Sequence, residues 1–249
     1  MIQIGRKEFG ISNFAIRILA VASMITAVVG YDKGHGYDWI EAFGWTSFTF
    51  FAFLLAEGVV HTTNKKLYLR RFLLFTVISE VLYTYYRSKT FWSTRYFSAM
   101  STMFLGFIVI LFVSFLKKKY DNVVLDMIAL AVLGYGAYWL AETFKFDFGG
   151  YGIIIIIGFY VARVVTYTRI TQAIVLFYIS FFLSSNVLGF VSIGGIQYPI
   201  ASELFSMIAL PFIWLYNDKR GPNSIVLQLL QYLAYPIMLA VLIFYRYFL

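Results

Sequence analysis

Residues 151–165 read YGIIIIIGFYVARVV, and this stretch decides the fold class of the chain. Its apolar side chains follow one another without the alternation of a strand that has one polar face, so the run favours a buried helix. Similar apolar runs, long enough to cross ~30 Å of hydrocarbon, recur along the whole sequence. The sequence therefore predicts an integral membrane protein in which helices, rather than a β-barrel, satisfy the backbone within the lipid.

The composition excludes a soluble globular domain. Hydrophobic residues make up 61% of the 249 residues and charged residues only 13%, whereas a soluble domain carries roughly 25% charged residues. A net charge of +8 would suggest nucleic acid as the partner of a soluble protein. Here the basic residues lie in short loops between apolar runs, so membrane lipid is the expected partner and nucleic acid is not. The chain has no cysteine, which excludes disulfides and thiolate chemistry.

We expect an all-α, polytopic membrane helix bundle that forms a single domain over residues 1–249. About nine transmembrane helices fit the pattern, within a range of eight to ten. The stretch 184–199, SSNVLGFVSIGGIQYP, is expected either to extend the seventh helix or to re-enter the membrane. The predicted spans are 13–31, 40–60, 70–86, 97–116, 122–142, 150–168, 172–190, 199–216 and 227–248.

The distribution of basic residues predicts that the N-terminus lies on the cytoplasmic side. The loop at 87–96, with Arg87, Lys89 and Arg95, is the exception on the opposite side. It is a functional basic mouth, a sign of a miscounted helix, or a loop whose basic charges are tolerated on that side. With the N-terminus inside, the cytoplasmic segments hold twelve of the 20 basic residues, namely Arg6, Lys7, Lys65, Lys66, Arg70, Arg71, Lys117, Lys118, Lys119, Arg169, Lys219 and Arg220.

Several ionisable residues lie within or next to the apolar runs, where a charge is costly. Glu57 and His61 are four residues apart and share one face of a helix. Glu80 lies inside the third span, and Asp147 precedes the sixth. One hypothesis is a polar cavity between helices in which Glu57, His61, Glu80 and Asp147 meet. The alternative is that each is a paired structural charge, and snorkelling to the membrane surface would account for Arg163.

Three blocks of sequence resemble the TraX family. Residues 51–83, FAFLLAEGVVHTTNKKLYLRRFLLFTVISEVLY, are similar to its central signature, in which Glu-Gly ends one helix, a His-Thr-x-Asn turn follows, and the next helix carries Arg and Ser-Glu. Residues 146–160 resemble its Asp-Tyr-Gly turn. ALPFIWLYNDKRG, followed by YLAYPIML, resembles its closing segments. The matching positions are Glu57, His61, Asn64, Arg71, Ser79, Glu80, Asp147, Asn217, Lys219, Arg220 and Tyr235.

The resemblance implies an integral membrane acyltransferase fold in a bacterial cytoplasmic membrane, related to pilin N-acetylases. Such an enzyme moves an acyl group from a cytoplasmic thioester, acyl-CoA or acetyl-CoA, to a membrane-associated protein or glycan, and no metal is expected. It implies catalytic roles for Glu57, His61, Glu80 and Asp147. The residues that would bind the donor are Arg70, Arg71, Asn217, Lys219 and Arg220.

The chain also departs from the family pattern. Ala27 and Val28 stand where the first helix carries Asp-His, and Met238 replaces a late histidine. Because Val28 cannot take a proton, these departures support an alternative, a catalytically degenerate member that serves as a binding or scaffold subunit of a membrane transport or secretion complex. A small transporter or channel is a third hypothesis, which no internal repeat supports.

Overall fold

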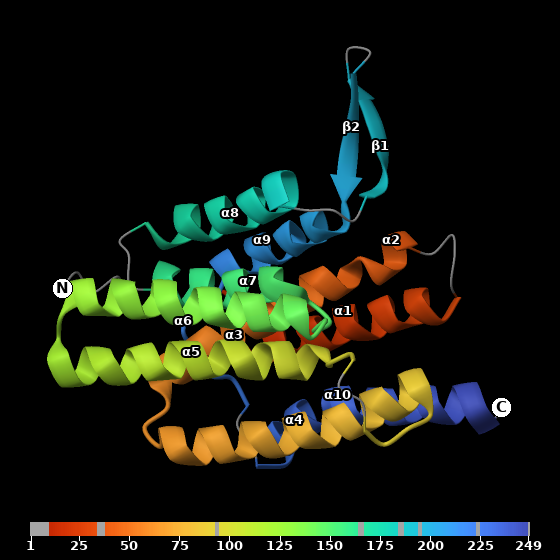
Figure 1. Cartoon of the computed structure of the whole chain (residues 1–249), viewed down its shortest axis with the longest axis horizontal. Helices are drawn as coiled ribbons and strands as arrows, with labels where there is room; N and C mark the ends of the chain where they lie inside the picture. Colours follow the sequence, from red (N-terminus) through yellow and green to blue (C-terminus); the bar gives the residue numbers. More distant parts are fainter. Residues whose placement is uncertain are drawn as a thin grey trace. The chain divides into compact units, whose positions relative to one another are not determined.

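The computed structural model describes residues 10–33, 38–92, 95–163, 167–183, 187–193, 196–222 and 225–248. The chain divides into two compact units, drawn together in Figure 1. Unit 1 comprises Met1–Leu54 and Val164–Asn223, and unit 2 comprises Leu55–Arg163 and Ser224–Leu249. Each unit is described by itself, and the single domain over 1–249 stays a prediction.

Unit 1 is mainly helical, and hydroxyl side chains tie its helices together. Ser47 Oγ donates a hydrogen bond to the carbonyl of Ala20 at 2.8 Å, and Thr46 Oγ1 donates to that of Phe205 at 2.7 Å. These bonds join the third helix to the first and to a later 3-10 helix. The helical elements are α1 (Asn13–Lys33), α2 (Asp38–Glu41), the first part of α3 (Phe43–His61), α8 (Thr168–Tyr178), the π-helix η1 (Ile179–Leu183), the 3-10 helix η2 (Ser202–Ile208) and α9 (Ala209–Trp214).

The stretch predicted to extend a helix or re-enter the membrane forms a β-hairpin instead (Figure 1). Strands β1 (Val187–Ile193) and β2 (Ile196–Ala201) pair antiparallel, with Phe190 opposite Pro199 and an irregularity between Val187 and Gly189. The prediction was wrong because it weighed hydrophobicity over turn chemistry. A Gly-Gly pair between short runs of β-branched and aromatic residues is a hairpin signal, and a proline opposes a helix interior.

Unit 2 is built from five helices together with the last part of α3. Polar side chains cap three of them at the N-terminus. Asn64 Oδ1 accepts from the backbone N–H of Leu67, Ser98 Oγ from that of Ser101, and Asn122 Oδ1 from that of Val124. Helix α4 packs against α10, and α5 packs against α6 and α7. The five helices are α4 (Lys65–Ser88), α5 (Ala99–Tyr120), α6 (Val123–Thr143), α7 (Gly149–Ala162) and α10 (Ile225–Phe248).

Four helical stretches among the described residues are long and apolar enough to cross a membrane. The third predicted span does not qualify, because α4 carries four basic residues in its first two turns. The sixth is shorter than predicted, since the 14 residues of α7 extend only ~21 Å. Arg6 and Lys7 lie outside the described residues, so the N-in orientation and the count of nine spans stay predictions. The four stretches are Asn13–Tyr31, Asp38–His61, Ala99–Tyr120 and Val123–Thr143.

One face of α6 is apolar and exposed, as a lipid-facing surface requires. Val124, Ile128, Val132, Tyr135 and Trp139 recur at intervals of three or four residues, and each is more than half exposed. That spacing aligns them on one side of the helix. A stripe of this kind fits a membrane protein, because hydrocarbon rather than water is its favourable surrounding.

Gly150 allows the start of α7 to pack against α6, so Gly150→Ala is expected to destabilise the protein. A Cβ at Gly150 would lie 2.2–2.7 Å from ring atoms of Tyr138, including the inflexible Cγ. Overpacking of this kind costs about 1–3 kcal/mol. Thermal unfolding of the purified protein in detergent measures the effect. The matched control is Gly136→Ala, where a Cβ meets nothing within 4 Å; there we expect no loss of stability, and equal melting temperatures for the two variants would contradict the prediction.

Candidate functional site

Glu57 and Arg163 form a two-pronged ion pair within unit 2. Arg163 Nε lies 2.7 Å from Glu57 Oε1, and Arg163 Nη2 donates to Glu57 Oε2 at 2.9 Å. The Glu57 side chain is only 4% exposed, whereas that of Arg163 is 32% exposed. A buried carboxylate is tolerated when a cation and its hydrogen bonds replace the lost water. Arg163 therefore fixes the orientation of both carboxylate oxygens.

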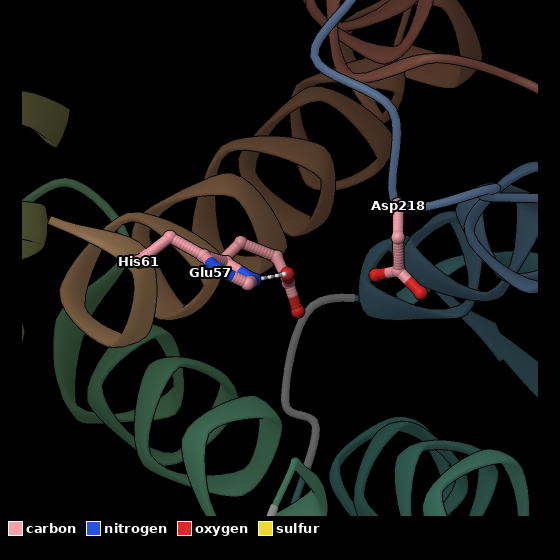
Figure 2. Close-up of side chains that lie close together, drawn as sticks. All are labelled: Glu57, His61 and Asp218. Carbon is pink, nitrogen blue, oxygen red and sulfur yellow. Dashed lines mark ion pairs between the residues drawn. The ribbon is translucent and has the colours of Figure 1, made fainter. Parts of the chain in front are cut away.

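His61 completes this group from the same helix face as Glu57 (Figure 2). Its Nε2 lies 3.2 Å from Glu57 Oε2 and 3.0 Å from Arg163 Nη2. Arginine can only donate, so its contact with His61 is a hydrogen bond when Nε2 carries a lone pair. The Glu57 carboxylate can only accept, so its contact is a hydrogen bond when Nε2 carries a proton. The His61 side chain is 52% exposed, so one edge of the group is open to a ligand.

The local fold explains why these three side chains meet. Helix α3 ends at His61, and α4 begins at Lys65 with Asn64 as its N-cap. Gly58 permits the close approach of α4, because a Cβ there would lie 2.7 Å from the hydroxyl of Tyr68. Arg163 directly follows the last residue of α7. Its positive charge is favourable at the C-terminal end of a helix, where the helix dipole is negative.

Glu80 belongs to a second polar group, at the start of α5. Glu80 Oε2 accepts from the backbone N–H of Ser98 at 3.1 Å and from the hydroxyl of Ser101 at 2.5 Å. These groups stand at the positive N-terminal end of α5, so the Glu80 carboxylate caps a neighbouring helix. Its second oxygen, Oε1, is buried without a hydrogen-bond partner among the described residues.

Asp147 lies beside this second group. The Tyr83 hydroxyl donates to Asp147 Oδ1 at 3.4 Å and accepts from Arg87 Nη1 at 3.3 Å. Tyr235 of α10 lies within electrostatic range of Asp147, Tyr83 and Glu80. The two predicted catalytic carboxylates Glu80 and Asp147 thus both lie near Tyr235, at the same end of unit 2.

The four predicted catalytic residues do not converge on one place. Fifteen residues of α4 separate Lys65, at the His61 end, from Glu80, which corresponds to ~22 Å along a helix. Helix α7 spans the same interval, with Asp147 before its first residue and Arg163 after its last. Glu57 and His61 therefore occupy one end of unit 2, and Glu80 and Asp147 the other.

Arg70 and Arg71, predicted to bind a donor, lie on α4 with exposed side chains. They are in the half of α4 nearer His61. Lys65 lies at the same end of unit 2, where its ammonium donates to Ser114 Oγ. Burial, followed by the charge of Lys118, lowers the pKa of Lys65. This end of unit 2 consequently carries a concentration of positive charge around the Glu57–His61–Arg163 group.

Asn217, Lys219 and Arg220 lie in a loop of unit 1. Asn217 is buried, donates from Nδ2 to the carbonyl of Gly10 at 3.1 Å, and accepts from the backbone N–H of Lys219 at 3.1 Å. The carbonyls of Lys219 and Arg220 accept from the N–H groups of Asn13 and Phe14 at the start of α1. The contacts of Asn217 are those of a residue that shapes the loop, whereas the Lys219 and Arg220 side chains are exposed.

Sequence reasoning missed the partnership of Arg163 with Glu57 and that of Tyr83 with Asp147. A charge of opposite sign in another apolar run was the available signal for the first pair. The tyrosine carried no distinguishing signal among 20 in the chain.

Asp218, also labelled in Figure 2, belongs to unit 1 and adopts a left-handed backbone with φ 59°. Within unit 2, Glu57 and His61 are potential metal ligands, but Arg163 already engages both oxygens of Glu57.

Comparison with known proteins identifies one family. The model of the TraX protein family matches residues 12–246, which is nearly the whole chain. No curated protein and no solved structure matches. The matched range includes both polar groups of unit 2 and the loop of unit 1 that carries Asn217.

The ion pair makes a prediction about stability. Arg163→Met leaves the Glu57 carboxylate buried without its main partner, and we expect the free energy of unfolding to fall by about 2–4 kcal/mol, because removing one member of a buried pair costs about 3–5 kcal/mol and Arg163 is partly solvated. Adding Glu57→Gln to Arg163→Met should recover much of this loss. Denaturant unfolding in detergent measures both, and a double variant less stable than Arg163→Met would contradict a closed pair.

The capping role of Glu80 makes a second prediction. Glu80→Ala removes the acceptor for Ser98 N–H and the Ser101 hydroxyl, so we expect a loss of about 1–3 kcal/mol. Glu80→Gln keeps a side-chain oxygen in the same position and should lose less than half as much. The same unfolding measurement compares the two variants, and equal losses would show that the negative charge, rather than the acceptor, is what α5 requires.

Proposed function

The chain belongs to the TraX family, and from this premise we propose that it transfers an acyl group from a cytoplasmic thioester donor, acyl-CoA or acetyl-CoA, to a membrane-associated protein or glycan. We place the reaction at the Glu57–His61–Arg163 end of unit 2. The observation that carries the proposal is the half-exposed imidazole of His61, held against a buried carboxylate. A bacterial cytoplasmic membrane is the proposed location.

The geometry supports His61 as the base. When Nε2 carries a proton and donates it to Glu57 Oε2, the other ring nitrogen, Nδ1, has a lone pair, and no described residue donates to it. Nδ1 can then take the proton of an acceptor amine or hydroxyl. Glu57 stabilises the imidazolium that results, as a carboxylate does in other His-carboxylate pairs.

The chemistry follows from these positions. The acceptor nitrogen or oxygen attacks the thioester carbonyl as its proton passes to His61 Nδ1. The new C–N or C–O bond forms, the C–S bond breaks, and the departing thiolate takes the proton back from His61. Arg163 is the nearest cation to the ring, and it favours the negative charge that develops on the carbonyl oxygen during the attack.

The surrounding charge supports a phosphate-bearing donor. Arg70, Arg71 and the exposed Lys117, Lys118 and Lys119 are in the parts of α4 and α5 nearest this end. Exposed cations raise the local concentration of an anionic substrate. We propose Arg70 and Arg71 as contacts for the phosphates of the donor. Roles for Asn217, Lys219 and Arg220 in donor binding, and for Glu80 and Asp147 in catalysis, stay predictions.

A binding or scaffold subunit is the second candidate function, and two observations favour it. Arg163 engages both oxygens of Glu57, which is the arrangement of a structural pair, and Val28 and Met238 replace ionisable residues of the family pattern. In that case the Glu57–His61–Arg163 group only holds the last part of α3 to α7, and no acyl group is transferred. The two candidates differ in whether a thioester is consumed.

The test is thiol release from acetyl-CoA by the purified protein in lipid nanodiscs. If His61 is the base, His61→Gln should lower the rate by ~10²–10⁴ while leaving donor binding within about threefold. Glu57→Gln should also lower the rate. Calorimetric binding of acetyl-CoA to each variant separates loss of chemistry from loss of affinity.

The control is Glu142→Gln, which alters an exposed carboxylate at the other end of unit 2 and should leave the rate unchanged. Absence of both donor binding and thiol release in the wild-type protein would favour the scaffold candidate. Thiol release that survives His61→Gln would remove His61 as the base while keeping acyl transfer.

A further inference from the structure

The end of unit 2 opposite His61 carries a surface of exposed cations and aromatic rings, which we name the basic–aromatic surface. It is formed by Arg87, Lys89, Tyr96, Lys145, Arg246 and Tyr247. It includes Arg87 and Lys89 of the loop at 87–96, whose basic residues are the exception to the predicted orientation in the membrane. The proposed acyl transfer uses none of these residues.

Two cations share the ring of Tyr96. The guanidinium of Arg87 lies 4.8 Å from the ring centroid, and the ammonium of Lys145 lies 5.9 Å from it. The backbone holds this arrangement, because Phe97 N–H donates to the Lys145 carbonyl and Asp147 N–H donates to the Phe97 carbonyl at 2.9 Å. Two cations from neighbouring segments are therefore held over one ring, and their combined positive charge favours an anion near them.

A second pair of cations extends the surface onto α10. Lys89 lies 4.8 Å from the centroid of Tyr247, and Arg246 lies 4.9 Å from that of Tyr86. The Tyr247 hydroxyl donates to the Tyr86 carbonyl at 3.0 Å, so α4 and α10 hold these rings in place together. Four cations from three segments of unit 2 are thus fixed on aromatic rings.

The carboxylates at this end do not balance the cations. Of the described residues here, three are acidic and five are basic, counting Arg95. Glu80 is committed to Ser98 and Ser101, and Glu142 accepts from the Gly150 N–H at 2.7 Å. Asp147 faces Tyr83. The surface keeps a net positive charge that is complementary to an anionic partner.

Neighbouring apolar rings identify a lipid rather than a soluble anion. Phe91 and Trp92 are 70% and 75% exposed, and Tyr245 is 55% exposed. Aromatic side chains with cations beside them are typical of the level of lipid headgroups. We propose that the basic–aromatic surface binds the phosphate headgroup of an anionic phospholipid, with Phe91 and Trp92 against the acyl-chain region.

The test measures lipid affinity of the full chain in detergent by native mass spectrometry, with dioleoyl phosphatidylglycerol and dioleoyl phosphatidylcholine as the probes. We expect at least a fivefold preference for phosphatidylglycerol. A cation near an anionic membrane surface contributes about fivefold in affinity, so the double variant Arg87→Gln/Lys145→Gln should lower phosphatidylglycerol affinity by about tenfold or more. Tyr96→Leu keeps every charge and should lower it by about threefold.

The matched control is Lys117→Gln/Lys119→Gln, which removes two exposed cations at the other end, one of them also over a ring, Tyr120. This control should stay within twofold of the wild type. Equal affinity for both lipids, an equal loss in the two double variants, or an unchanged affinity in Tyr96→Leu would each overturn the proposal. Displacement of the lipid by an equal concentration of glycerol 3-phosphate would also overturn it, in favour of a soluble anion.

Discussion

The buried charge of Glu57 is the constraint on which unit 2 depends at its His61 end. A carboxylate that is 4% exposed has given up nearly all of its water, and a low dielectric makes that loss expensive. Arg163 compensates through two contacts, which couple the last part of α3 to the end of α7. The same contacts also hold Glu57 Oε2 within reach of His61 Nε2. Structural pairing and a chemically useful geometry are therefore consequences of one interaction.

The two charged groups of unit 2 lie at its two ends, and large apolar side chains fill much of the described core between them. Phe107, Ile110, Ile153 and Ile156 are fully buried there, and close-packed apolar side chains leave no room for water. This separation assigns different surroundings to Glu57 and Glu80, even though both interrupt apolar runs in a similar way.

Much of the fold could be predicted from the sequence, but only part of the candidate site. Apolar runs located the helices because burial acts along a single segment, and the spacing of Glu57 and His61 correctly put them on one helix face. The contact with Arg163 depends on how α3 meets α7, more than 100 residues away in sequence, and no periodicity encodes it. The hairpin at 187–201 was not predicted for a different reason, because hydrophobicity alone does not distinguish a short strand from a helix.

The position of Arg163 also bears on how His61 could act as a base. Arg163 Nη2 and Glu57 Oε2 approach the same ring nitrogen, and Nε2 cannot satisfy both at once, because one contact requires a lone pair and the other a proton. With the lone pair on Nε2, the proton sits on Nδ1, which can then only donate. With the proton on Nε2, Nδ1 can accept. In the proposed mechanism, His61 therefore acts as a base only in the second tautomer, in which Nε2 donates to Glu57 Oε2 instead of accepting from Arg163 Nη2.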